Sequence, residues 1–112
     1  NAVLSICQEG DEVLVPMPYW VSYPEQVRLA GASPVFIPSR VENGFKITPD
    51  DLERVITSKS KLLIFNSPNN PSGAVYDPEL LQKIADVLAG TSIFILTDEI
   101  YEKIVFDGRT HV

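Results

Sequence analysis

The sequence has little cysteine, little basic charge and no long apolar run. Cys7 is the only cysteine among 112 residues, so no internal disulfide can form, and we expect this thiol to pack in a core within a reducing compartment, the cytoplasm. The 9 Lys and Arg stand against 15 Asp and Glu, and the net charge of −6 argues against nucleic acid or an anionic membrane surface as a partner. No apolar run approaches the roughly 20 residues that span a bilayer.

The first ten residues, NAVLSICQEG, contain neither an initiator Met nor a basic segment. We therefore expect that they are not a secretion signal and that the chain is cut from a longer protein. A chain of 112 residues is long enough for one domain with a real core and too short for two. We therefore expect residues 1–112 to form a single, partial domain.

Four short apolar runs predict β-strands. The last two are continuously apolar rather than alternating, which is the pattern of strands covered on both faces of a parallel sheet. The four predicted strands are Val13–Pro16, Pro34–Pro38, Leu62–Asn66 and Ile93–Thr97.

Helix signals lie between these runs. Thr48 and Asp77 are each followed by a proline, the pattern of an N-cap with proline at the first helical position. Ser22 with Glu25 three residues later indicates a capping box. Residues 2–7 are typical of the last part of another helix, and residues 101–106, YEKIVF, could form a further short helix or strand. Strands that alternate with helices predict an α/β fold in three layers with a largely parallel sheet.

Residues at the carboxyl ends of the strands are the candidates for a ligand site, because open α/β sheets bind ligands at that edge. Trp20 follows the first predicted strand, Asn70 the third, and Asp98 and Tyr101 the fourth. An indole, an amide, a carboxylate and a phenol should therefore meet at one edge. This set suits a flat heteroaromatic ligand with a ring nitrogen and an exocyclic oxygen.

Four segments together resemble the middle of class I aminotransferases, which are fold type I enzymes that depend on pyridoxal 5′-phosphate. In order, they are GDEVLVPMPYWVSYPEQVRLAGA, ITPDDLERVIT, LLIFNSPNNPSGAVY and ILTDEIYEKIVFDG. They are most similar to the aspartate and aspartate/prephenate branch. The pair NNPSG and DEIY is the most specific part, although Ser72 stands where the family usually has Thr. The resemblance implies a central piece of the large, cofactor-binding domain of a homodimeric, cytoplasmic enzyme.

The resemblance also implies a role for each strand-end residue. Asp98 would face the pyridine nitrogen and keep it protonated, which makes the ring an electron sink. Asn70 and Tyr101 would hydrogen-bond the 3′-oxygen of the ring, and Trp20 would stack on its face. The family pattern further implies a cis peptide bond between Asn70 and Pro71.

The family needs a lysine that forms a Schiff base with the cofactor, and we find no candidate for it in this chain. Lys61 in SKSK matches the short motif around that lysine, but it precedes the third strand and should lie at the opposite edge of the sheet. We therefore assign no catalytic residue here. The parent protein would move an amino group from an amino acid, aspartate by resemblance, to a 2-oxo acid. The cut sheet would leave unpaired edges, so we expect the chain to self-associate.

Two alternatives remain open from the sequence. One is another fold type I enzyme such as a β-lyase, and the other is a non-catalytic α/β binding module. A nucleotide hydrolase is disfavoured because no G-x-x-x-x-G-K-[ST] loop is present. We expect no metal site. Glu99 is interpreted as a cap or surface ion-pair residue and His111 as solvated, and the three tyrosines Tyr19, Tyr23 and Tyr76 are interpreted as packing or surface residues.

Overall fold

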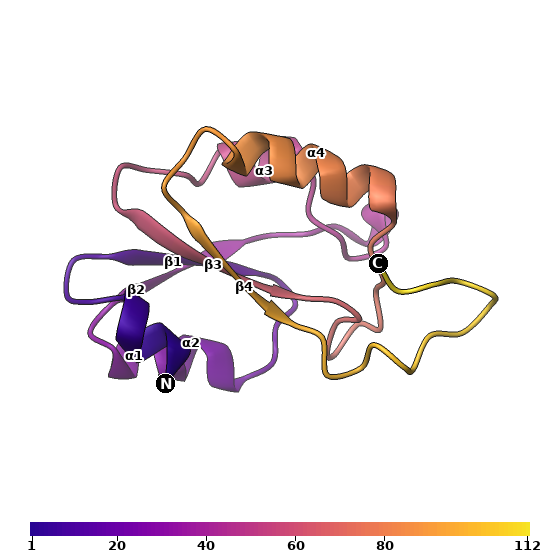
Figure 1. The fold of residues 1–112 in the computed structure, drawn as a ribbon, viewed down its shortest axis with the longest axis horizontal. Coiled ribbons are helices and arrows are strands. Elements are labelled where there is room, and N and C mark those ends of the chain that lie inside the picture. The colour runs from indigo at the N-terminus through magenta and orange to yellow at the C-terminus, as the bar shows by residue number, and fades with distance from the viewer.

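A computed structural model describes all residues 1–112 and shows three layers, with one four-stranded sheet between two layers of helices (Figure 1). All strand pairs are parallel, and the strand order is β2-β1-β3-β4. This confirms the predicted fold class. The strands are β1 (Glu12–Pro16), β2 (Ser33–Ile37), β3 (Ser60–Asn66) and β4 (Phe94–Asp98). The helices are α1 (Ala2–Ile6), α2 (Ser22–Leu29), α3 (Pro49–Glu53) and α4 (Pro78–Leu88), with a 3₁₀ turn at Val41–Asn43.

Two apolar cores lie on the two faces of the sheet. One core joins α1 and α2 to the sheet and includes Val27, Leu62 and the predicted packing thiol of Cys7, which is buried and free. The other core joins α3 and α4 to the opposite face and includes Leu63 and Leu88. Successive residues of β3 therefore enter different cores, because side chains alternate along a strand.

The two N-caps followed by proline are confirmed. Thr48 caps α3 through its side chain, which accepts from the backbone N of Asp51, and the Asp51 carboxylate in turn accepts from the Thr48 amide. Asp77 caps α4 by accepting from the backbone N of Leu80 at 3.0 Å. Each cap satisfies amides that the helix itself leaves unpaired.

The predicted capping box at Ser22 is wrong. Helix α2 already includes Ser22, and its N-cap is Val21, whose backbone is helical (φ −52°, ψ −24°) and which makes no side-chain cap bond. The chain turns early because the Tyr23 amide donates to the Trp20 carbonyl at 3.0 Å. Glu25, the expected partner of Ser22, pairs with Arg28 instead.

The end of the chain departs from prediction in two places. Strand β4 is not covered on both faces, since Phe94 and Ile95 are 53% and 50% exposed. It is an edge strand with β3 as its one neighbour. Residues 101–106, expected to form a helix or strand, instead form a turn at 101–103, closed by a bond from Ile104 N to Tyr101 O at 2.8 Å, followed by an irregular segment. The segment after β4 loops outward and returns toward α4 (Figure 1). No helix combines the length and apolar character needed to cross a bilayer.

Candidate functional site

A cavity of about 180 Å³ opens at the carboxyl ends of β3 and β4. We call it the strand-end cavity. All four residues predicted as cofactor ligands line it, although they come from three separate stretches of the chain. The lining residues are Trp20, Tyr23, Asn66, Asn70, Asp98, Ile100 and Tyr101. The structure therefore places the predicted set together at the predicted edge of the sheet.

The indole of Trp20 stands at the N-terminal end of α2. Its ring meets the ring of Tyr23 edge to face, with centroids 5.5 Å apart and planes at 86°. The residue stays 41% exposed. Because one ring edge is fixed by Tyr23 while much of the indole surface remains uncovered, Trp20 can cover a flat ligand without first being released from the core.

The loop after β3 is held by its own side chains. The Asn69 carboxamide oxygen accepts from the backbone N of Ser72 at 3.2 Å and from the Ser72 hydroxyl at 2.7 Å. The Asn70–Pro71 peptide bond is cis, as predicted. Gly73 has φ +70°, a left-handed conformation that glycine adopts without a Cβ clash. The side-chain amide of Asn70 makes no hydrogen bond with the protein, so its donors and acceptor are available to a ligand.

The carboxylate of Asp98 is oriented by two donors. The Tyr23 hydroxyl donates to Oδ2 at 2.6 Å, and the backbone N of Ile100 donates to Oδ1 at 3.3 Å. Burial, followed by the hydrogen bond to Asp98, raises the pKa of Tyr23 far above its ordinary value. Tyr23 therefore remains a hydrogen-bond donor throughout the physiological pH range, and Asp98 keeps lone pairs for another partner.

Three lining residues were not among the predicted ligands, and two of them, Tyr23 and Asn66, have polar side chains. Tyr23 is a residue of α2 and is buried in the core, in line with the predicted packing role, but its hydroxyl also reaches Asp98. Helical spacing offered no signal for Tyr23, because Trp20 precedes α2. A turn in which the Tyr23 amide donates to the Trp20 carbonyl brings the two residues together. Asn66 ends β3, and the sequence offered no signal that separates it from Asn69 or Asn70.

The donors and acceptors around the cavity fit the ring of pyridoxal phosphate. Asp98 supplies a carboxylate for a protonated ring nitrogen. Asn70 and the Tyr101 hydroxyl, neither of whose side chains hydrogen-bonds the protein, supply donors for an exocyclic oxygen. Trp20 supplies an apolar face. A site with two uncommitted polar side chains and one oriented carboxylate is suited to bind a polar aromatic ring rather than an aliphatic chain.

Lys61 lies where the sequence placed it, at the start of β3 and so at the opposite edge of the sheet. Its Nζ sits 5.6 Å from the centre of the Phe94 ring. No lysine lines the strand-end cavity. The structure thus supports the exclusion of Lys61 from the candidate site.

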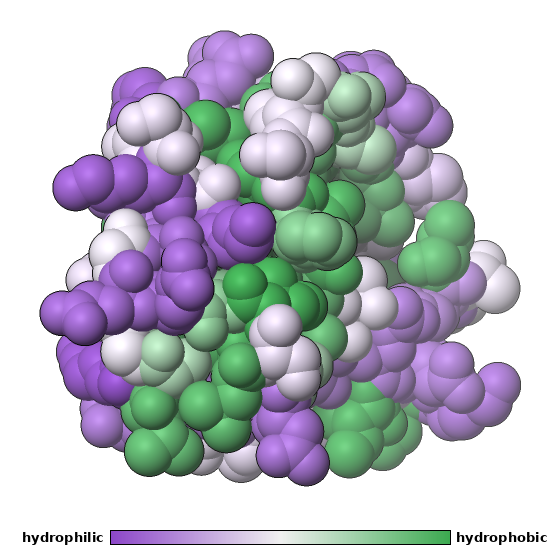
Figure 2. All heavy atoms as spheres, turned by 60° about the vertical axis from the view of Figure 1, so that its left-hand side comes forward, coloured by the Kyte–Doolittle hydropathy of each residue, from purple (hydrophilic) through white to green (hydrophobic).

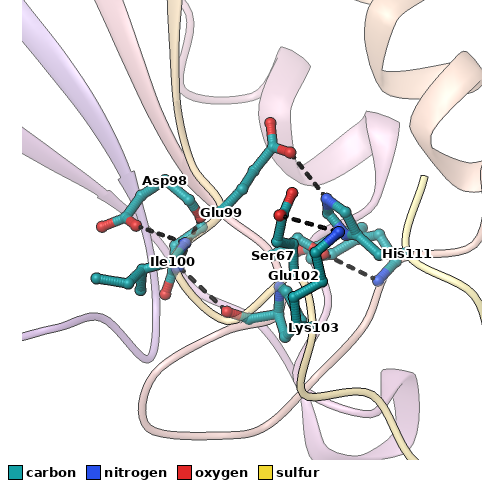
Figure 3. A network of polar contacts seen from close by, with 10 residues as sticks. Ser67, Asp98, Glu99, Ile100, Glu102, Lys103 and His111 are labelled. Carbon is teal, nitrogen blue, oxygen red and sulfur yellow. Dashed lines mark hydrogen bonds and ion pairs between the residues drawn. The ribbon is translucent and has the colours of Figure 1, made fainter.

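Glu99, the residue after Asp98, belongs to a second cluster of polar side chains beside the strand-end cavity. Figure 3 shows the carboxylates of Asp98 and Glu99 pointing in different directions, with Glu99 directed to His111. The Glu99 Oε2 and the His111 Nε2 are 2.8 Å apart, and this hydrogen bond holds the pKa of Glu99 below its ordinary value. Glu99 is a partly exposed residue that bonds His111, in line with the predicted surface pairing role, and the contact is an ion pair only when His111 is protonated. The prediction that His111 is solvated is wrong, since its side chain is only 15% exposed. Glu102, which lies close to both, pairs with Lys103.

Comparison with known proteins identifies the family. The family model described as "Aminotransferase class I and II" matches residues 1–112. The chain therefore belongs to the class I and II aminotransferases, which confirms the resemblance found in the sequence motifs. It is 52% identical over 106 residues to an aspartate aminotransferase of Bacillus sp. (strain YM-2), a match that covers 95% of this chain and 27% of that protein. The chain thus spans about a quarter of this relative's length.

Two solved structures have nearly the same fold. The aspartate aminotransferase from Rhizobium meliloti aligns with a TM-score of 0.95 at 38% identity, over 99% of this chain and 28% of that one. The aromatic aminotransferase from Pyrococcus horikoshii OT3 aligns with a TM-score of 0.94, also at 38% identity, over 97% of this chain and 29% of that one. Equal identity to enzymes named for different substrates means that this comparison does not select a substrate.

Proposed function

We propose that this chain is the central part of the large domain of a pyridoxal phosphate-dependent aminotransferase. The parent enzyme would move an amino group from an amino acid to a 2-oxo acid. One observation carries the proposal: the four residues that the family motifs nominate, from three separate stretches, line one cavity at the carboxyl edge of a parallel sheet. Family membership supports the reaction class.

When bound, pyridoxal phosphate supplies an electron-withdrawing ring that stabilises the negative charge left after an amino acid loses its α-proton. In the proposed site, the Asp98 carboxylate would hold a proton on the ring nitrogen by charge pairing. Tyr23 and the Ile100 amide keep that carboxylate in one orientation. Asn70 and Tyr101 would bind the 3′-oxygen of the ring, and Trp20 would cover one face and exclude water from it.

The lysine that anchors the cofactor is not in the strand-end cavity, so we propose that the chain alone is inactive and that a segment outside it supplies this group. A substrate of the aspartate type is supported by the relative from Bacillus. We propose a cytoplasmic location for the parent, in keeping with the free, buried Cys7. A homodimeric parent is proposed from the family resemblance alone. A β-lyase is less well supported than a transaminase, because the family match is to aminotransferases.

The test uses the full-length protein in which this chain occurs, with Asp98→Ala and the control Asp86→Ala. Asp86 is exposed on α4 and bonds only Gln82, so its loss should leave transamination unchanged. Asp98→Ala should lower the rate of amino transfer by at least about 100-fold. A wild-type protein that binds no pyridoxal phosphate in an absorbance titration, or an Asp98→Ala variant as active as the control, would contradict the proposal.

A second measurement separates the fragment from a complete binding module. The 112-residue chain is treated with pyridoxal phosphate and borohydride and then mapped by peptide analysis, with a denatured sample as control. We expect no saturable adduct on a single lysine. A specific adduct would mean that the chain carries its own anchoring lysine, and the proposed division of the site would be wrong.

A further inference from the structure

Asn66 is the last residue of β3, and it lies between the two parts of the chain that carry the proposed cofactor side chains. It is only 7% exposed, although it lines the strand-end cavity. A buried asparagine needs partners for its side-chain donors and acceptor, because an unsatisfied amide is costly in a core. The partners it uses indicate what it does.

The side chain of Asn66 bonds to both sides of the site. Its Oδ1 accepts from the backbone N of Asn70 at 2.8 Å. Its Nδ2 donates to the backbone O of Asp98 at 2.9 Å and to that of Pro68 at 3.1 Å. One amide therefore connects the loop after β3 to the end of β4. A second hydrogen bond joins the same two segments, from the Ser67 amide to the Asp98 carbonyl, and it is longer, at 3.3 Å.

The spacing between Asn70 and Asp98 has a chemical meaning in the proposed site. The ring nitrogen and the 3′-oxygen belong to one rigid ring, so the groups that bind them must be held at a fixed separation to act together. The paired backbones of β3 and β4 end at Asn66 and Asp98. Beyond that point the loop that carries Asn70 has no strand to fix it, and β4 has no neighbour on its outer side.

We infer that Asn66 is a positioning residue, which sets the distance between Asn70 and Asp98 through its two-sided hydrogen bonds. This inference rests on the proposed function, because the distance matters only if both residues hold one ligand. Asn66 itself does not need to touch the ligand. Its carboxamide is already committed to Asn70, Asp98 and Pro68.

Two variants separate the bond of Asn66 to the Asn70 amide from its bond to the Asp98 carbonyl; we call these bonds the two arms of the link. Asn66→Ala removes both arms. Asn66→Asp has nearly the same volume and keeps an oxygen facing the Asn70 amide, but it replaces the donor that faces the Asp98 carbonyl with a second oxygen. Tyr76→Phe is the matched control for stability, since the Tyr76 hydroxyl accepts a buried bond from the Ile47 amide at 2.8 Å and lies outside the strand-end cavity.

The experiment measures three quantities in the full-length protein. They are the dissociation constant of pyridoxal phosphate, the pH midpoint of the absorbance change of the bound cofactor, and hydrogen exchange of residues 66–73 without cofactor. Asn66→Ala should weaken binding about tenfold, shift the midpoint and speed the exchange. Asn66→Asp should shift the midpoint while exchange stays slow, because the arm to Asn70 is kept. Tyr76→Phe should change none of the three.

Different results overturn different statements. If either Asn66 variant folds and keeps the wild-type dissociation constant and midpoint, Asn66 is only a packing residue and the inference is wrong. The same conclusion follows if Tyr76→Phe shifts the midpoint as much as Asn66→Ala does, because a loss of stability alone would then explain the effect. A wild-type protein that binds no pyridoxal phosphate overturns the proposed function and, with it, this role for Asn66. Should Asn66→Ala fail to fold, the nearly isosteric Asn66→Asp still tests the inference through the pH midpoint of the bound cofactor.

Discussion

Strands β3 and β4 are alike in sequence and differ in surroundings. Both are apolar and parallel, and each ends in a polar residue of the candidate site, Asn66 and Asp98. The apolar centre of β3 is almost fully buried, with Leu62, Leu63 and Ile64 at 0%, 1% and 2% exposure, whereas β4 is half exposed. The reason is position, because β3 pairs with β1 and β4, while β4 pairs with β3 alone. An apolar run therefore specifies a strand, but its neighbours decide its burial.

The difference does not extend to the carboxyl ends. There, hydrogen bonds from Tyr23, Asn66 and the Ile100 amide hold Asp98 at the end of the exposed strand. Most of β4 is exposed to solvent, whereas Asp98 at its end is fixed by hydrogen bonds. Packing and site geometry are thus supplied by different interactions, which can be perturbed separately.

The largest expected effect comes from shortening a side chain in the buried strand. Leu63→Ala removes a side chain that packs against α3 and α4, and it should lower the free energy of unfolding by about 2–5 kcal/mol. Ile95→Ala on β4 should lower it by less than about 1.5 kcal/mol, since half of that residue is already in water. Urea unfolding of dilute chain measures both. Equal losses would contradict the contrast between the strands.

The next effect concerns a buried hydrogen bond over β3. Tyr76 packs on Phe65, with ring centroids 4.7 Å apart, and its hydroxyl accepts from the Ile47 amide. Tyr76→Phe should cost about 1–3 kcal/mol, because that buried amide loses its partner. The expected loss lies below that of Leu63→Ala, and the pH dependence of the loss distinguishes it from a packing defect.

The pH dependence follows from the tyrosine itself. Burial raises the pKa of Tyr76 to about 12 from 10.0. A folded pKa above the unfolded one stabilises the protonated, folded form, so this contribution is complete below pH 10.0 and disappears as the pH rises through about 12. Urea unfolding should show the difference between wild type and Tyr76→Phe shrinking over that range. A difference that stays constant would argue against a buried phenol.

The exposed face of β4 should govern association rather than stability. Figure 2 shows extensive apolar surface open on one face of the molecule, and Phe94 and Ile95 are among the exposed apolar residues. We propose that the isolated chain self-associates through this unpaired edge. Ile95→Lys should shift it toward monomer in sedimentation velocity runs, because a charge on an edge strand opposes pairing. A wild-type chain that is monomeric and unfolds cooperatively would contradict the proposal.

The sequence predicted the strands, the N-caps at Thr48 and Asp77 and the edge where the polar residues meet, because these depend on local pattern and on the parallel order; the capping box predicted at Ser22 was wrong. It did not predict the exposure of β4, which depends on which strands are present beside it. It placed Trp20, Asn70, Asp98 and Tyr101 correctly at one edge, yet it could not single out Asn66. Three asparagines in NSPNN are equivalent as letters, and only the fold turns one of them inward to bond Asp98.

The smallest expected effect lies at the other end of the β3–β4 pair. Lys61→Gln removes a cation that lies 5.6 Å from the centre of the Phe94 ring. The ring is half exposed, so the free energy of unfolding should fall by less than about 1 kcal/mol. Because Lys61 lies at the amino end of β3, Lys61→Gln in the full-length protein should bind pyridoxal phosphate with an unchanged dissociation constant. Loss of binding would place a cofactor group at the wrong edge of the sheet, and the candidate site would have to be moved there.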